Sequence, residues 1–153
     1  MEWSPEELVE SWTLVEEDWR LLGNKGGATR LGFAVVLKFF EVKAAFPVRS
    51  ADVPSAAVAY PAEQVRVDPS ALDGYRWTGR TIEYHRAQVR EAFGFREFAH
   101  ADEDLLSQWL SEHVCPVEQR DEQLLEALLV RCRALRIGVP RVSRTVDIIF
   151  PLR

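Results

Sequence analysis

The sequence predicts an all-α protein, a multi-helix bundle of roughly seven to eight helices. Apolar residues recur at helical spacing along most of the chain, capping motifs precede several of these stretches, and no convincing strand alternation or internal repeat is present. A chain of 153 residues with 47% hydrophobic and 28% charged residues has the composition of a folded protein, which excludes a disordered one. This length accommodates one domain with a substantial core, or two small subdomains.

Two capping motifs predict short helices at the N-terminus. Ser4-Pro5-Glu6-Glu7 has the pattern of a capping box with proline at the first helical position. Thr13-Leu14-Val15-Glu16 has the pattern of a second box, which would open a helix that runs to about residue 22.

The next part of the chain predicts two longer helices. A glycine-rich turn over residues 23–27 precedes a strongly apolar helix from about 28 to 45. A loop bounded by two prolines follows, and then a helix over about 54–65. Pro61 is expected to kink or end this helix, because proline lacks the backbone N–H that a helix interior requires.

The middle of the chain has the outline of a helix-turn-helix. Asp68-Pro69 predicts the start of a short helix that ends near Tyr75, and the turn Arg76–Gly79 leads into a longer helix that ends at Gly94. Thr78 is the predicted N-cap of this second helix.

Further helices are expected at about 101–114, 118–136 and 141–149, separated by Pro116 and Pro140. We expect an N-terminal helical subdomain over residues 1–66 and a C-terminal one, with the helix-turn-helix-like unit, over 67–153. The alternative is one continuous domain.

The helix that ends at Gly94 is amphipathic in an unusual way. At 3.6 residues per turn its core stripe carries Ile82, Val89 and Phe93. The opposite stripe and its borders carry a set of polar side chains, namely Arg80, Thr81, Tyr84, Gln88 and Arg90. Arginine and glutamine can form bidentate hydrogen bonds to guanine and adenine edges respectively, so this face suits a DNA groove. The alternative is a solvated helix face with ordinary surface arginines.

Charge alternates along the chain although the net charge is −5. Residues 76–100 carry five cations and three acids, residues 101–130 one cation and eight acids, and residues 131–153 six cations and one acid. A fold can gather such basic segments on one side, and the local field matters more than net charge for phosphate binding. Any soluble helical protein also shows mixed charge, so this pattern only supports DNA binding.

Other basic segments have two interpretations each. Lys25 and Arg30, around the start of a helix, could hold a DNA phosphate, or the segment is a plain interhelical turn. Arg141 and Arg144 belong to a basic C-terminal tail, which either contacts phosphates or is a solvated end.

No pattern predicts catalysis, a cofactor or a metal. The three histidines and the cysteines Cys115 and Cys132 lack the paired spacing of a zinc site, and His85, at the rim of the core stripe, is expected to be semi-buried. Two cysteines are too few for a disulfide framework. With no signal peptide or membrane-spanning run evident, we expect a bacterial cytoplasmic, nucleoid-associated protein that does not bind membranes.

Several segments together resemble the N-terminal domain of transposases of the Tn-three family, a region classed as a domain of unknown function. The matching stretches are Thr13–Leu22, Arg30–Ala34, Val53-Pro54 with Tyr60, Tyr75–Arg96, Trp109–His113, and Arg136-Ile137 with Pro140. They follow the expected order over most of the chain, and the Gly79–Phe95 stretch is specific.

The resemblance implies a helical domain that recognises the terminal inverted repeats of a transposon in double-stranded DNA. By position it implies DNA contacts from the polar set of the helix, and Arg76 and Thr78 lie in the turn just before it. Family members continue into a magnesium-dependent Asp-Asp-Glu nuclease, whereas this chain ends at Arg153. We therefore expect an isolated or truncated DNA-binding module that cuts nothing.

The alternative is an all-helical protein–protein interaction module, which would dock to another transposase copy, form homo-oligomers, or act as a truncated regulator of transposition. The apolar stretch Phe33–Phe46 and the acidic region 101–130 would be its surfaces.

Overall fold

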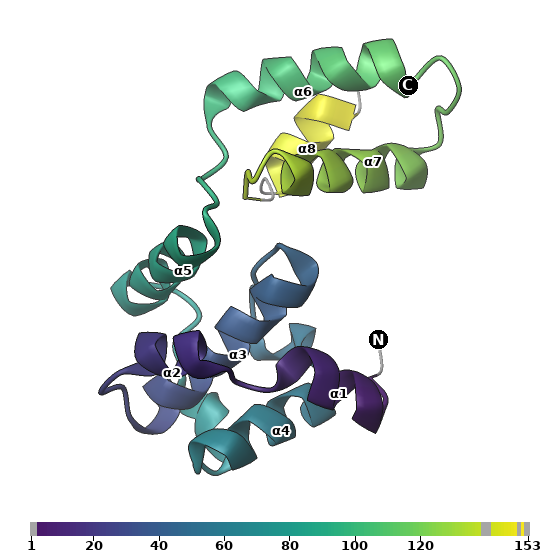
Figure 1. The fold of residues 1–153 in the computed structure, drawn as a ribbon. Coiled ribbons are helices and arrows are strands. Elements are labelled where there is room, and N and C mark those ends of the chain that lie inside the picture. Colours follow the sequence, from purple (N-terminus) through teal and green to yellow (C-terminus); the bar gives the residue numbers. More distant parts are fainter. Residues whose placement is uncertain (1–2, 139–141, 150, 152–153) are drawn as a thin grey trace. The chain divides into compact units, whose positions relative to one another are not determined.

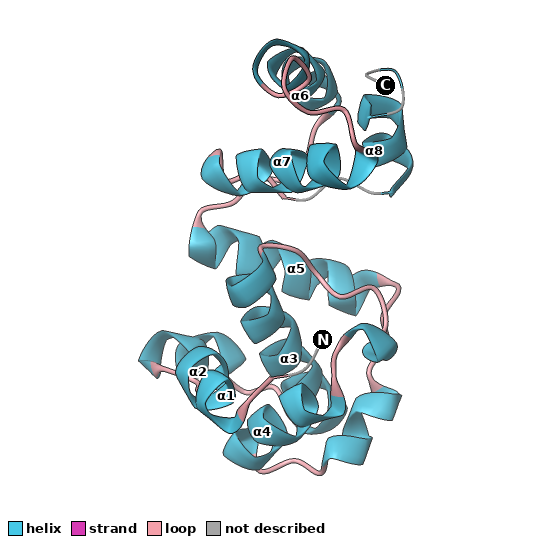
Figure 2. Cartoon of the chain, turned by 90° about the vertical axis from the view of Figure 1, so that its right-hand side faces the viewer, coloured by secondary structure: helices cyan, strands magenta, loops and turns pink. Residues whose placement is uncertain are grey.

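The computed structural model describes residues 3–138, 142–149 and 151. These residues form eight α-helices and two 3₁₀-helices, and the one β-type contact among them is an isolated bridge (Figures 1 and 2). The predicted all-α class is confirmed. The chain divides into two compact units, Met1–Phe93 and Gly94–Arg153.

The first unit is built around α3 (Gly27–Lys43), which packs against α1, α2, α4, α5 and the 3₁₀-helix η2. Every residue from Leu31 to Phe40 is buried, because a helix that is apolar around most of its circumference must be covered on all sides. The helices that cover it are α1 (Pro5–Trp12), α2 (Glu16–Leu22), α4 (Ser55–Val65) and α5 (Arg80–Phe93), together with η2 (Pro69–Gly74). A second 3₁₀-helix, η1 (Ser50–Asp52), lies in the loop before α4.

The division between the two units lies between Phe93 and Gly94, whereas the sequence predicts a boundary between residues 66 and 67. Since η2 and α5 both pack on α3, the helix-turn-helix-like segment belongs to the N-terminal unit. The first member of this helical pair is a six-residue 3₁₀-helix, and its start is capped as expected by Asp68, whose carboxylate accepts from the Ser70 backbone N–H.

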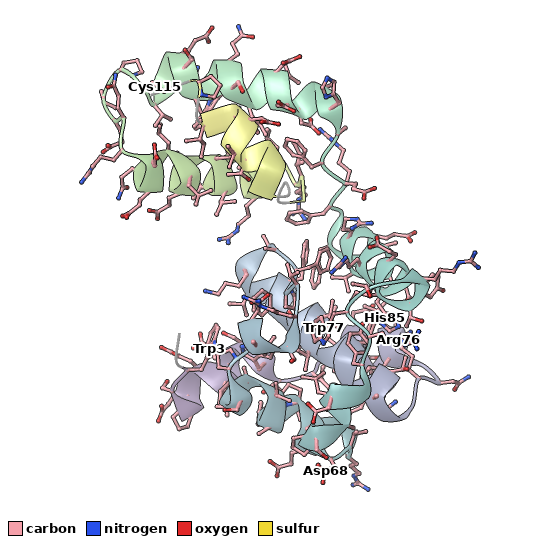
Figure 3. All side chains as sticks on the ribbon, turned by 180° about the vertical axis from the view of Figure 1, so that it is seen from behind. Trp3, Asp68, Arg76, Trp77, His85 and Cys115 are labelled. Atoms are coloured by element: carbon pink, nitrogen blue, oxygen red, sulfur yellow. The ribbon has the colours of Figure 1, made fainter. Side chains whose placement is uncertain are left out.

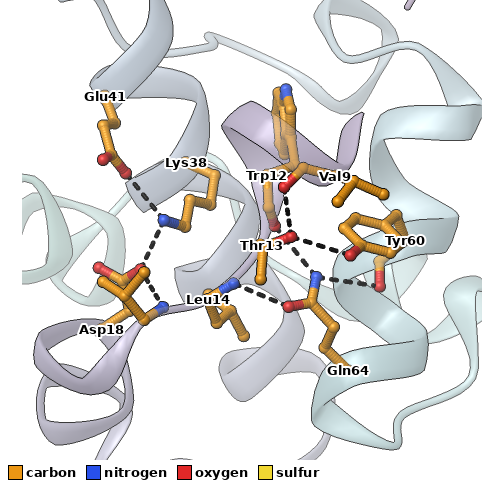
Figure 4. Close-up of polar contacts among 10 residues, drawn as sticks. Val9, Trp12, Thr13, Leu14, Asp18, Lys38, Glu41, Tyr60 and Gln64 are labelled. Carbon is orange, nitrogen blue, oxygen red and sulfur yellow. Dashed lines mark hydrogen bonds and ion pairs between the residues drawn. The ribbon is translucent and has the colours of Figure 1, made fainter. Parts of the chain in front are cut away.

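The Ser4 capping box is confirmed, but the predicted Thr13 box is wrong. The residue before α2 is Val15, whose N–H donates to the Asp18 carboxylate at 2.9 Å. Thr13 instead ends α1, where its hydroxyl donates to the Val9 carbonyl and lies 2.9 Å from the Tyr60 hydroxyl (Figure 4). Its local sequence is compatible with both roles, and the tertiary contact with α4 decides between them.

Pro61 does not end α4, which continues to Val65. The proline is buried together with Ala57, Val58 and Ala62. Burial of this small apolar face offsets the backbone hydrogen bond that Pro61 cannot donate.

The second unit consists of α6 (His100–His113), α7 (Asp121–Ala134) and α8 (Val142–Ile149), which pack on one another. Its core is formed by leucines and isoleucines from the three helices, by Cys132, and by Ile137. Arg96 joins its parts: the Arg96 backbone pairs with the turn after α7, and its guanidinium forms two hydrogen bonds with the Asp102 carboxylate at the start of α6. These hydrogen bonds hold the pKa of Asp102 below its ordinary value.

Candidate nucleic-acid interface

Helix α5 is divided into a buried side and an open side, as its sequence predicts. Ile82 and Val89 are fully covered, and Gly94, with φ of 71°, ends the helix as expected. Three residues of the polar set are exposed on the opposite side, namely Arg80, Thr81 and Tyr84. Tyr84 exposes 63% of its surface, which is high for an aromatic side chain and leaves its ring and hydroxyl available to a partner.

The turn before α5 adds two further exposed residues, Arg76 and Thr78. Thr78 is not the N-cap that the sequence predicts, because the helix begins at Arg80 and the cap position falls on Gly79. The Glu83 N–H donates to the Gly79 carbonyl, and Gly79 has φ of 102°, a conformation that favours glycine. Thr78 is thereby displaced into the turn, where its side chain is open to solvent.

Gln88 and Arg90 do not share the exposure of the other polar residues of α5. Gln88 is half-buried, and its amide oxygen is covered without a hydrogen-bond partner among the described residues. Arg90 is half-buried as well, with its guanidinium 5.9 Å from the centre of the Phe46 ring. Both residues lie on the flanks of the helix, which helical periodicity alone could not distinguish from its open face.

The glycine-rich segment before α3 uses its two cations locally. The Lys25 ammonium donates to the Leu21 carbonyl at 2.9 Å and lies 4.4 Å from the centre of the Phe33 ring, and burial lowers the pKa of Lys25. Arg30 donates to the Lys25 carbonyl and lies over the Trp19 ring. These contacts favour the interhelical-turn interpretation, and a role of either residue in DNA binding stays a prediction.

The basic tail is only partly described. Arg141 lies outside the described residues, and Arg144 belongs to α8 but its side chain lies outside them. Their predicted phosphate contacts stay predictions.

An aromatic cluster fixes the base of α5 in a way that the sequence did not predict. The Tyr75 hydroxyl and His85 Nδ1 are 2.6 Å apart, and both side chains are buried. Phe33 from α3 and His85 pack edge to face, and so do Trp77 and Tyr75. Trp77 and His85 are labelled in Figure 3. His85 is therefore fully enclosed rather than semi-buried, and burial together with the nearby positive charge of Lys25 lowers its pKa to about 4.

The enclosure of His85 predicts a pH-dependent stability. The pKa of His85 is about 4 in the folded chain and about 6.5 when the side chain is free in water. As the pH falls from 6.5 to 4, the unfolded chain takes up a proton that the folded chain does not. His85 therefore removes up to about 3 kcal/mol of stability over this range. Urea denaturation at several pH values should show a smaller loss for His85→Gln than for the wild-type chain.

The control for this measurement is His113→Gln, because His113 lies at the exposed end of α6. It should lose stability with falling pH as the wild-type chain does. Parallel curves for the wild-type chain and His85→Gln would contradict the prediction.

The family model for a domain of unknown function, DUF4158, matches residues 1–150. The chain belongs to this family. The match spans both compact units of the DUF4158 chain and includes α5 with the turn before it, and it confirms the predicted relationship to a domain of unknown function.

Two further observations concern the described part of the DUF4158 chain. No three His, Cys, Asp or Glu side chains there are grouped so that they could hold a metal ion. None of the helices described there has the length and apolar character needed to cross a bilayer.

The apolar stretch Phe33–Phe46, expected as one surface of a protein–protein interaction module, is only partly accessible. Its residues from Phe33 to Phe40 are buried inside the first unit, whereas Glu41 is exposed and Phe46 is half-buried. A role of this stretch in contact with a partner chain stays a prediction.

Proposed function

We propose that this DUF4158 chain is a DNA-binding module that recognises the terminal inverted repeats of a transposon and carries out no cleavage. The observation that carries this proposal is the open face of α5, where Arg80, Thr81 and Tyr84 are exposed together on a helix whose other side is anchored in the core. The resemblance of Gly79–Phe95 to the corresponding stretch of Tn-three family transposases supports the same function.

The chemistry of the exposed set suits the major groove. Arg80 can form two parallel hydrogen bonds to the O6 and N7 atoms of guanine, and Thr81 can donate to or accept from a base edge. A helix of 14 residues with one covered side has the dimensions of a recognition helix. Because Gln88 and Arg90 lie on its flanks, base contacts are expected from the first two turns of α5.

The turn before α5 supplies contacts of another kind. Arg76 and Thr78 are exposed beside the N-terminus of the helix, whose free backbone N–H groups and positive dipole end favour a phosphate. Phosphate contacts orient a protein on the duplex but carry no sequence information. The first unit therefore offers residues for orientation and residues for base reading at the same end of one helix.

The proposal is tested with Arg80→Ala on duplexes selected from a random pool by the wild-type chain. One good bidentate contact is worth about 1–3 kcal/mol of discrimination. We therefore expect Arg80→Ala to lower the ratio of the affinities for selected and scrambled duplexes about 5- to 150-fold. The affinity for scrambled DNA should change little. Gln88→Ala should reduce the ratio less, because Gln88 is half-buried. Gel-shift titration at fixed salt gives both affinities.

Arg20→Ala is the matched control, since Arg20 is an exposed arginine that pairs with Glu16 and Glu17 on α2. It should leave the ratio unchanged. Equal, weak binding of selected and scrambled duplexes by the wild-type chain would overturn the proposal.

A further inference from the structure

We infer that the hydrogen bond between Tyr75 and His85 positions the DNA-reading segment. This inference rests on the proposed function, because it concerns the segment to which that function is assigned. The two partners are ten residues apart, and the exposed candidate residues all lie between them, namely Arg76, Thr78, Arg80, Thr81 and Tyr84. The hydrogen bond therefore joins the two ends of the chain segment that carries the exposed residues.

The first partner is held against the central helix. The Tyr75 ring lies directly over Gly32 of α3, where a Cβ atom would come within 2.0–2.3 Å of three ring carbons. Tyr75 is 5% exposed, and Trp77 packs edge to face with its ring at a centroid distance of 5.1 Å. Gly32 thus creates the space in which the start of the segment is fixed.

The second partner is held from the same helix. The edge-to-face contact between Phe33 and His85 has a centroid distance of 5.0 Å, and His85 exposes 2% of its surface. Adjacent residues of α3, Gly32 and Phe33, therefore contact Tyr75 and His85 respectively. Between these two contacts the chain runs through the turn at residues 76–79 and the first turns of α5, where Ile82 is also buried.

Within the turn, Trp77 packs edge to face on the Tyr75 ring, so this restraint also depends on the position of Tyr75. Gly79 adopts a left-handed conformation, and a Cβ atom at this position would meet no atom within 4 Å. Thr78 does not cap the helix, so the start of α5 is not fixed by a side-chain cap on that residue. Without the Tyr75–His85 hydrogen bond the turn has fewer restraints, and the direction in which Arg76 and Arg80 point is less well defined. Tyr75 and His85 are positioning residues, since neither is open to DNA.

The test is Tyr75→Phe, which keeps the ring over Gly32 and removes only the hydroxyl. The matched control is Tyr60→Phe, because the Tyr60 hydroxyl also has a part-buried partner, Thr13, but lies on α4. Amide hydrogen exchange followed by mass spectrometry should show faster exchange in residues 76–84 for Tyr75→Phe only. Gel-shift titration should show the affinity ratio between selected and scrambled duplexes falling about two- to tenfold, the equivalent of one net hydrogen bond.

Tyr60→Phe should leave both the exchange of residues 76–84 and the affinity ratio as in the wild-type chain. Exchange in this segment that is no faster in Tyr75→Phe than in Tyr60→Phe overturns the inference. An affinity ratio that Tyr75→Phe leaves unchanged, in a wild-type chain that discriminates, also overturns it. A wild-type chain that fails to discriminate duplexes rejects the proposed function instead, and hydrogen exchange then still tests the positioning role.

Discussion

Replacing Lys38 with methionine should lower the free energy of unfolding of the first unit by about 3–5 kcal/mol. Lys38 lies in the middle of α3 with 2% of its side chain exposed, and its ammonium forms ion pairs with Asp18 of α2 and Glu41 of α3 (Figure 4). The Asp18 side chain is 6% exposed. Removal of the lysine would leave a buried carboxylate whose charge has lost its partner, and this uncompensated charge dominates the expected loss. Urea denaturation followed by circular dichroism measures it.

Two controls separate the buried charge from other effects of the substitution. Arg20→Met removes an exposed cation from the surface of α2, and a loss of no more than about 1 kcal/mol is expected. Asp18→Asn combined with Lys38→Met removes both charges, while asparagine can still accept from the Val15 N–H. This double variant should be more stable than Lys38→Met alone. If it is not, the loss comes from packing around Lys38 and the electrostatic explanation is wrong.

Gly32→Ala should lower the free energy of unfolding by about 2–3 kcal/mol. A methyl group at this position would overlap the Tyr75 ring, and the ring cannot move freely because it is buried and linked to His85. Overpacking usually costs about 1–3 kcal/mol and occasionally more, and an overlap with three carbons of a confined ring places this cost at about 3–4 kcal/mol. The better helix propensity of alanine offsets about 1 kcal/mol, which leaves the expected loss of about 2–3 kcal/mol. Thermal and urea denaturation measure the change.

Gly74→Ala is the control, because a Cβ atom there would make only an ordinary contact at 3.5 Å with Ala28. We expect a change within about 0.5 kcal/mol. The steric explanation is tested further in a Tyr75→Ala background, where Gly32→Ala should no longer destabilise the chain. A cost that persists in that background would show that Tyr75 is not the obstacle.

The sequence predicted the helices well because their signals are local. The capping box at Ser4 and the left-handed glycine after Phe93 act within one turn of the backbone, and both lie where expected. Thr13 and Thr78 were assigned to caps wrongly for the same reason. Both have suitable local sequences, but a contact with Tyr60 and the conformation of Gly79 place them elsewhere.

The candidate interface was predicted only in part. Periodicity indicates which side of α5 faces outward, so the exposure of Arg80 and Tyr84 agrees with it. Periodicity does not indicate how deeply a helix is embedded among its neighbours. In the folded chain α5 is embedded deeply enough for its flank at Gln88 to be half-buried. Periodicity also gives no information about residues on other elements, such as the Phe46 ring beside Arg90.

By itself, the sequence determined the all-α class, the approximate bounds of the helices and the open face of α5, because these follow from interactions within a few residues of the chain. Only the tertiary structure decided that Lys38 is buried in an ion pair and that Gly32 accommodates a tyrosine ring. It also decided that Tyr75 and His85, which flank the exposed segment in the sequence, are joined by a hydrogen bond. Each of these depends on side chains from different elements meeting in space. Such meetings are set by the packing of whole helices, which no local pattern of residues encodes.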